Sequence, residues 1–189
     1  MINMGEGGWL IAFLIVQRLA ELALATRNSL RLRAAGGVEF GAAHYPLIVA
    51  LHAFWLLGLW VAGHDRDVDP VWLAIFILLQ AGRVWVIVSL GSRWTTRIIV
   101  MPGSTPVARG PYRVLRHPNY AVVALEIAVV PLALGLPLFA LFFTFLNAAL
   151  LAWRIRVENR ALAWAVQGES VNSGPTTQTT TLANDTPRR

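Results

Sequence analysis

One short run in the second half of the chain concentrates side chains that can bind and orient a ligand. The run from Gly110 to Tyr120 reads GPYRVLRHPNY and contains two Arg, one His and two Tyr. Arginine recognises carboxylates and phosphates, and the face of an aromatic ring attracts a cationic centre. The run leads directly into a strongly apolar stretch, which has no structural need for such a cluster. We therefore expect the chemistry of this protein to take place here, at a membrane surface.

The prolines of this run predict its backbone. A Gly-Pro pair opens it with a turn, and Pro118 disfavours a helical conformation for His117. The polar side chains are thus expected on an irregular or re-entrant segment beside the start of a helix. At membrane depth, such a segment must be buried in protein or line a cavity. The alternative is an anchor at the membrane interface, which explains Tyr112 and Arg113 well but the ordered Arg-His-Pro-x-Tyr less well.

The composition indicates an integral membrane protein. Of the 189 residues, 56% are hydrophobic and 14% are charged, whereas soluble domains average about 25% charged residues. The absence of Cys excludes disulfides, thiolate catalysis and Cys-based metal sites, and we expect no metal ion. The net charge of +6 comes with Arg and no Lys, a bias typical of a GC-rich bacterial genome. Because the Arg residues are scattered among apolar spans, the partner is expected to be a lipid bilayer and no nucleic acid.

Long apolar stretches predict the elements that position the cluster. A membrane-crossing helix needs roughly 20 residues, and residues 9–25, 45–62 and 71–90 supply three candidates. The stretch 121–153 is too long for one helix. Pro131, Gly135 and Pro137 interrupt it, which predicts a helical hairpin. The predicted fold is an all-α integral membrane protein with about five transmembrane helices, a C-terminal helical hairpin and a cytoplasmic pocket.

Charged connections predict the orientation of these helices. The three basic connections contain Arg27, Arg31 and Arg33; Arg93, Arg97, Arg109, Arg113 and Arg116; and Arg154, Arg156 and Arg160. With five spans all three lie on one side, which the positive-inside rule makes cytoplasmic. We therefore expect a multi-pass protein of the bacterial inner membrane, with its N-terminus outside and its C-terminus cytoplasmic. Residues 1–167 would form the membrane domain, and the polar residues 168–189 a disordered tail.

Several charged side chains fall inside the predicted spans. Arg18 and Glu21 are three residues apart on one helical face, so they can pair with each other. Arg83 and Glu126 lie in the third and fourth spans. A charge near the bilayer centre costs roughly 2.5–3.5 kcal/mol or more, so such groups face the bundle interior or a polar cavity. For Arg83 and Glu126, the sequence allows both a structural role and a site that opens to the cytoplasm.

The run resembles the signature of the isoprenylcysteine carboxyl methyltransferase family, and phospholipid methyltransferases are similar more distantly. Further matches are Arg93-Trp94-Thr95-Thr96, Met101-Pro102-Gly103, Arg154-x-x-x-Glu158 with Leu162, Gln17-Arg18-x-x-Glu21-Leu22 and His44-Tyr45-Pro46. The last two are similar to the bacterial branch that is often associated with type III polyketide synthases. The resemblance covers residues from about 10 to 165.

The resemblance implies a cytoplasmic pocket for S-adenosylmethionine and a lipophilic acceptor that enters from the bilayer. The cofactor-binding residues it implies are Tyr112, Arg116, His117, Pro118, Tyr120, Glu158 and Leu162. It places Arg154 near the reacting oxygen of the acceptor, which would be a carboxylate or an acidic hydroxyl of an isoprenylcysteine-like, alkylpyrone or alkylresorcinol lipid. The other catalytic position is Asn159, where the family carries a second Glu.

Two other functions are weighed against the methyltransferase. Asn159 and the sequence after Ala163, which lacks the family's Phe-Gly-x-x-Tyr, allow a non-catalytic membrane binding protein of the same fold. Some sterol reductases carry a similar Arg-His-Pro-Asn-Tyr string, so an NADPH-dependent reductase is the third reading. The short length and five spans count against it, because those reductases are larger.

Overall fold

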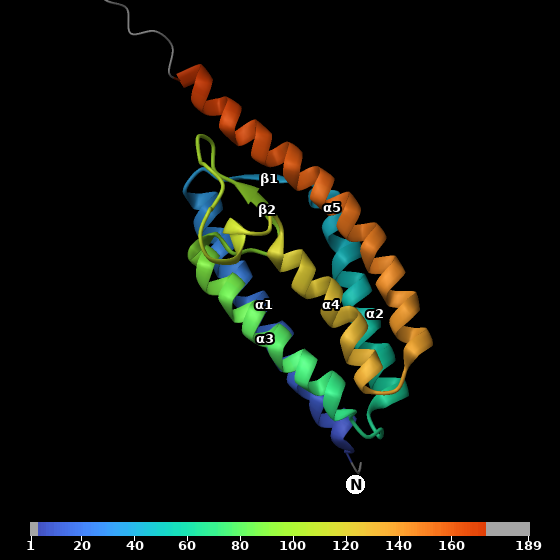
Figure 1. Ribbon diagram of the computed structural model, residues 1–189. Coiled ribbons are helices and arrows are strands. Elements are labelled where there is room, and N and C mark those ends of the chain that lie inside the picture. The colour runs from blue at the N-terminus through green and yellow to red at the C-terminus, as the bar shows by residue number, and fades with distance from the viewer. Residues whose placement is uncertain (1–3, 173–189) are drawn as a thin grey trace, which may run out of the picture.

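Five helices form the body of the protein (Figure 1). In this computed structural model, the backbone is described for residues 4–172 and the side chains for residues 4–166. The helices are α1 (Glu6–Ala34), α2 (Tyr45–Gly63), α3 (Pro70–Leu90), α4 (Pro118–Ala133) and α5 (Pro137–Asn172). They run alternately up and down, so the start of α1 and the end of α5 lie at opposite ends of the bundle (Figure 1). The predicted helical fold is confirmed.

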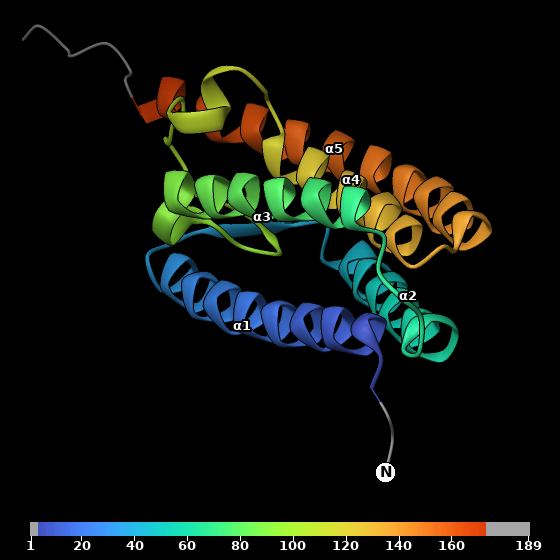
Figure 2. The same cartoon turned by 60° about the horizontal axis from the view of Figure 1, so that its bottom comes forward.

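The helices are arranged in two layers. Figure 2 shows α1 and α2 in one layer and α3, α4 and α5 in the other, with α4 between its two neighbours. The core between the layers is built from side chains with no exposure to solvent, among them Trp55, Ile11, Leu14, Leu59 and Ile127. Many large apolar side chains on the outer helix faces are exposed, for example Trp9, Phe54 and Phe145. Such an apolar exterior suits contact with lipid.

Four of these helical segments are long and apolar enough to cross a membrane: Glu6–Ala34, Ala42–Gly63, Pro70–Arg93 and Pro137–Val166. The remaining helix, α4, has 16 residues. At 1.5 Å per residue it is about 24 Å long, which is less than the roughly 30 Å of a hydrocarbon core. The structure thus has a helix for each of the five predicted spans, and four of them are long and apolar enough to cross a membrane. The count of about five transmembrane helices stays a prediction.

The predicted hairpin is present, but its break comes later than Pro131. This proline lies within the last turn of α4, and the turn follows at residues 134–136. Gly135 has φ +66°, a left-handed conformation that glycine adopts without strain. The backbone N–H of Leu136 donates to the Pro131 carbonyl oxygen at 2.8 Å, which closes the turn. Helix α5 then continues to Asn172, so the predicted domain boundary at Gln167 falls inside this helix, and residues 173–189 lie outside the described part.

A small antiparallel sheet was not predicted. Strands β1 (Val38–Phe40) and β2 (Ile98–Val100) join the connection after α1 to the connection after α3. Ile98 and Val100 pack on Ala161 and Ala165 of α5, which are fully buried. Because these two alanines are small and lie one helical turn apart, the strand can approach the helix closely. Three 3₁₀ helices complete the connections: η1 (Ala42–His44), η2 (Gly91–Arg93) and η3 (Gly110–Arg113).

A network of charged and amide side chains lies between the two layers. Arg18 donates to Glu21 at 2.8 Å, as their spacing predicts, and also to Glu126, which has no exposed surface. Arg83 pairs with Glu126 and donates to Glu21 at 3.1 Å. Gln80 donates to Glu126 at 2.7 Å. The network therefore joins α1, α3 and α4, and Arg83 and Glu126 serve the interior of the bundle.

Candidate functional site

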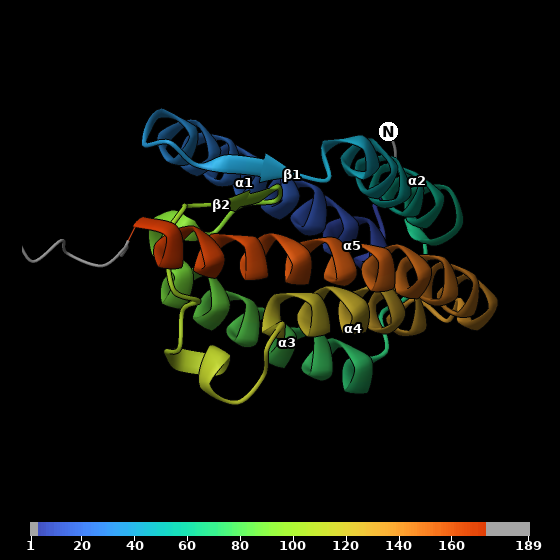
Figure 3. The ribbon, with the colours of Figure 1, turned by 90° about the horizontal axis from the view of Figure 1, so that it is seen from above.

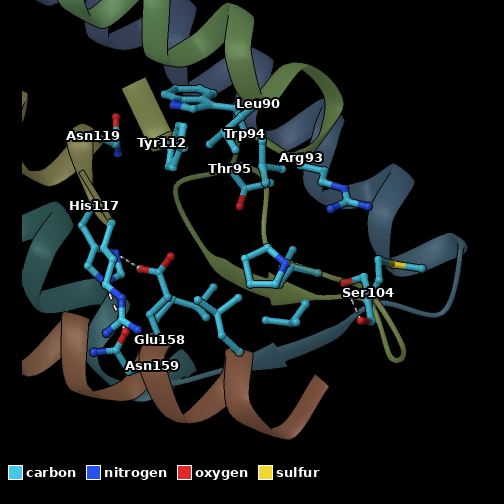
Figure 4. A pocket seen from close by; sticks show the side chains of 18 of the residues that line it. Leu90, Arg93, Trp94, Thr95, Ser104, Tyr112, His117, Asn119, Glu158 and Asn159 are labelled. Atoms are coloured by element: carbon cyan, nitrogen blue, oxygen red, sulfur yellow. Dashed lines mark hydrogen bonds and ion pairs between the residues drawn. The ribbon is translucent and has the colours of Figure 1, made fainter. Parts of the chain in front are cut away.

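A cavity of about 630 Å³ lies at the end of the bundle where α3 ends and α4 begins (Figure 4). Its wall is formed by η2, β2, the connection from β2 to η3, the start of α4 and the last described turns of α5. This volume is within the range of small-molecule and cofactor sites, about 300–1,000 Å³. The cavity is therefore the place to look for a ligand.

The segment before α4 is fixed to α3 by a close backbone contact. Gly110 has φ +57°, and a Cβ atom at this position would lie 2.1 Å from the Ser89 hydroxyl oxygen. Only glycine satisfies both the conformation and the approach. Arg109 Nε donates to the Ser89 carbonyl oxygen at 2.6 Å, and Pro111 is buried. These contacts hold η3 against α3 and bring Tyr112 to the cavity.

His117 occupies the junction between this segment and α4. Its φ of −130° and ψ of 61° lie outside the helical region, as Pro118 predicts, although ψ falls short of a fully extended chain. The imidazole stacks on the ring of Tyr120, with centroids 5.4 Å apart and planes 19° apart. Its Nε2 lies 3.2 Å from Asn159 Oδ1 on α5. His117 thus connects the start of α4 to α5 beside the cavity (Figure 4).

A hydrogen-bonded chain joins the two halves of the site. The Tyr120 hydroxyl donates to Glu158 Oε2 and accepts from Arg154 Nε at 2.8 Å. Arg154 Nη2 also donates to the carbonyl oxygen of Thr96, just before β2, at 2.6 Å. The Arg154 side chain is 6% exposed. A buried guanidinium needs such partners, so Tyr120 and Thr96 fix its position at the cavity wall.

The charges of the cavity wall are unequal. Four arginines line it: Arg93, Arg97, Arg116 and Arg154. Among the lining side chains that the structure describes, Glu158 is the acidic one. Glu158 Oε2 lies 3.8 Å from His117 Nδ1. A ligand with both an anionic and a cationic or hydroxyl-bearing part would find complementary groups here.

Tyr112 keeps its proton in this setting. Burial raises the pKa of the Tyr112 phenol, and the negative charge of Glu158 raises that pKa further. The phenol is therefore neutral throughout the physiological range, and it presents a hydroxyl and a ring face to the cavity.

The structure brings together eight of the nine predicted site residues. Tyr112, Arg116, His117, Tyr120, Arg154, Glu158, Asn159 and Leu162 line the cavity. Pro118 is buried at the first turn of α4 and does not line it. The roles assigned to these residues remain predictions.

Other parts of the wall were not predicted as site residues. Strand β2 and residues 104–108 form one side, and Trp94 and Asn119 contribute to others. Trp94 is held by α1, because Asn28 Nδ2 donates to its carbonyl oxygen at 2.8 Å. The β-branched run Ile98-Ile99-Val100 was the available signal for the strand.

Comparisons with known proteins identify a family and two relatives. The sequence profile described as "Isoprenylcysteine carboxyl methyltransferase (ICMT) family" matches residues 72–164, which include the predicted site residues. The "Uncharacterized protein YpbQ" of Bacillus subtilis (strain 168) is 42% identical over 158 residues, covering 81% of this chain and 94% of the relative. An "Uncharacterized protein" of Haemophilus influenzae is 26% identical over 163 residues, covering 80% of this chain and 92% of the relative. No solved structure matches the chain.

Proposed function

This chain belongs to the isoprenylcysteine carboxyl methyltransferase family and is a membrane methyltransferase; from this premise, we propose that it transfers a methyl group from S-adenosylmethionine to an oxygen of a lipophilic acceptor. The observation that carries the proposal is the pair of hydrogen bonds that links the side chains of Arg154, Tyr120 and Glu158. It joins the two separated parts of the family motif at one cavity.

The groups of the cavity suit this cofactor. S-adenosylmethionine has a carboxylate, an ammonium group, ribose hydroxyls and a sulfonium centre. Arg93 or Arg116 at the wall can hold the carboxylate, and Glu158 can accept from the ammonium or the hydroxyls. Glu158 Oε1 has no hydrogen-bond partner among the described side chains, so it is available to a ligand. The neutral rings of Tyr112 and Tyr120 offer faces to the sulfonium.

Arg154 suits the acceptor. Its Nε and Nη2 donate to Tyr120 and Thr96. Its Nη1 has no partner within the described residues and remains free to donate to an anionic oxygen. A carboxylate or an acidic hydroxyl arrives ionised at neutral pH, so no general base is required. We infer that Arg154 binds this oxygen and orients it.

The length of α4 supports a lipophilic acceptor. This helix is about 24 Å long and rises from the hairpin turn at the far end of the bundle. The start of α4, which follows His117 and contains Tyr120, would therefore lie within the hydrocarbon core or at its edge. An acceptor such as an isoprenylcysteine-like, alkylpyrone or alkylresorcinol lipid would present its reactive oxygen at this level while its chain stays in the bilayer.

Bound S-adenosylmethionine would supply an electrophilic methyl group. The protein's part is alignment: methyl transfer is an in-line displacement, which requires the acceptor oxygen, the carbon and the sulfur on one line. Glu158, together with Arg93 or Arg116, would hold the methyl donor, and Arg154 would hold the methyl acceptor. The buried walls formed by β2 and α5 would exclude water.

Asn159 distinguishes the proposal from its alternative. The family carries a Glu at this position, whereas here the amide oxygen lies 3.2 Å from His117 Nε2. A neutral amide at this place removes one negative charge from the wall. This observation favours, as the second candidate, a relative that binds its ligands without transferring the methyl group.

We also propose the orientation given by the arginine-rich connections, with the cavity on the cytoplasmic side of the bacterial inner membrane. The start of α1 would lie outside and the end of α5 inside. The basic connections after α1 and α3 lie at the same end as the cavity, which agrees with the positive-inside rule.

The test is calorimetry with protein in lipid nanodiscs, followed by a methyl-transfer assay over a panel of lipid acceptors. We expect binding of S-adenosylmethionine and none of NADPH. Glu158→Gln removes one charge-assisted hydrogen bond worth about 1.5–3 kcal/mol, which raises the Kd roughly 10–150-fold. Asp67→Asn makes the same chemical change at an exposed turn and should leave the Kd unaltered.

The outcomes separate the readings. Binding of NADPH without S-adenosylmethionine would overturn the methyltransferase proposal. Unchanged binding in both Glu158→Gln and His117→Ala would overturn the assigned site. If the protein binds the cofactor but transfers no methyl group, and Asn159→Glu creates activity, the non-catalytic reading is correct.

A further inference from the structure

Within the segment from Arg109 to Arg116, the side chains of Arg113, Val114 and Leu115 do not line the cavity. Val114 is 83% exposed and Leu115 is 50% exposed. They lie between Arg113 and Arg116, which are both exposed. We name residues 109–116 the interfacial loop.

The interfacial loop lies outside the helical bundle. Figure 3 shows it projecting beyond α3 on the side away from α1. Its contacts are with the last turns of α3, where Gly110 meets Ser89 and approaches the indole nitrogen of Trp85. Trp85 is itself 56% exposed on the outer face of this apolar helix. The loop is therefore held at the end of a membrane-crossing segment, beside a tryptophan of the kind that marks the membrane interface.

The charge of this region is one-sided. Residues 91–117 contain five Arg and no Asp or Glu. Arg97 pairs with Glu39, and Arg93 and Arg109 donate to backbone carbonyl oxygens. Arg113 and Arg116 form no ion pair or hydrogen bond with any residue that the structure describes. Two guanidinium groups beside two exposed apolar side chains thus lack a partner within the described chain.

We propose that the interfacial loop binds anionic phospholipids, with Val114 and Leu115 inserted among the upper acyl chains and Arg113 on the phosphate headgroups. Apolar side chains at the interface are stabilised by leaving water, and each basic residue near an anionic surface strengthens binding about fivefold. Arginine suits this role because its guanidinium donates two hydrogen bonds to one phosphate. The inference does not depend on the methyltransferase proposal.

The chain contains no Cys, so a single label can report on the loop. We would attach a fluorophore through Val114→Cys and, separately, through Leu115→Cys, in nanodiscs of mixed phosphatidylcholine and phosphatidylglycerol. In separate samples, either the phosphatidylcholine or the phosphatidylglycerol carries a spin label, which quenches the fluorophore when that lipid contacts it. A label introduced by Asp67→Cys, in the acidic turn at the other end of the bundle, is the positional control.

We expect quenching at both loop positions, with phosphatidylglycerol favoured over phosphatidylcholine, and no such preference at position 67. Adding Arg113→Gln should lower the preference by about fivefold, the effect of one basic residue. Arg156→Gln removes an exposed arginine from α5 and should leave the preference unchanged. No quenching at either loop position, or an equal preference with and without Arg113, would overturn the proposal.

Discussion

Replacing Glu126 by Gln should destabilise the bundle more than any other single loss of a carboxylate. Glu126 is fully buried and is hydrogen-bonded by Arg18, Gln80 and Arg83. The network holds two positive and two negative side chains, with Glu21 as the second acid. Glu126→Gln leaves two guanidinium groups with one carboxylate. An uncompensated buried charge costs about 3–5 kcal/mol, which is the expected loss in the free energy of unfolding.

A second substitution shows whether charge imbalance is the cause. Arg83, 3% exposed, is the other deeply buried member of the network. In the double variant Glu126→Gln with Arg83→Gln, the pair of Arg18 and Glu21 on α1 remains neutral by itself. The double variant should therefore be more stable than Glu126→Gln alone.

The assay is unfolding by sodium dodecyl sulfate in mixed micelles, followed by fluorescence of the eight Trp residues. Asp67→Asn serves as the control, because it removes a carboxylate from an exposed turn. Hydrogen bonds between membrane helices are worth only about 0.6 kcal/mol on average. A loss near that value in Glu126→Gln, with an additive double variant, would refute the role of charge balance.

Three further results are expected. Gly110→Ala should destabilise the protein by about 1–3 kcal/mol, because it adds a clash with Ser89 to backbone strain. Gly103→Ala is the control: Gly103 has φ +69° and open space around it, so this change should cost about 1 kcal/mol. Equal losses of stability for the two variants in thermal unfolding would contradict the contact between residue 110 and Ser89. Because the pKa of Tyr112 is raised, the folded state holds the phenol proton more tightly than the unfolded state does. The contribution of this proton to stability is therefore complete below the ordinary tyrosine pKa of about 10, and it declines as the pH rises above that value. Tyr112→Phe should flatten that decline in alkaline unfolding experiments, and an unaltered slope would disprove it. Glu39→Gln breaks two partly exposed ion pairs and should lower stability by less than about 1 kcal/mol in chemical unfolding; a larger loss would show that the sheet carries more of the fold than its exposure indicates.

The helices could be predicted because their signals are local. Apolar length identified α2 and α3, and the cluster of Pro131, Gly135 and Pro137 indicated a hairpin. Pro131 was misleading as a break, since it lies inside α4 and the helix continues for two more residues, to Ala133. The pairing of Arg18 with Glu21 also followed from spacing alone.

Features that depend on distant parts of the chain could not be predicted. Strands β1 and β2 have three residues each, and they pair because the connections after α1 and α3 lie at the same end of the bundle. No local sequence pattern indicates that Glu126 pairs with Arg18 and Arg83. The candidate site was recoverable because its residues carry a family motif, whereas the β2 wall, shaped by the small residues Ala161 and Ala165, carries none.

The network between the layers has a consequence for how the protein enters the membrane during synthesis. Helix α1 emerges from the ribosome with Arg18 and Glu21 already able to neutralise each other. Helix α3 brings Arg83 before its main partner Glu126 has been made, since α4 follows α3 in the chain. Glu21 accepts from Arg83 at 3.1 Å, so α1 can shelter this arginine until α4 arrives. We therefore expect the first helix to assist insertion of the third, so that loss of Glu21 delays membrane integration of α3.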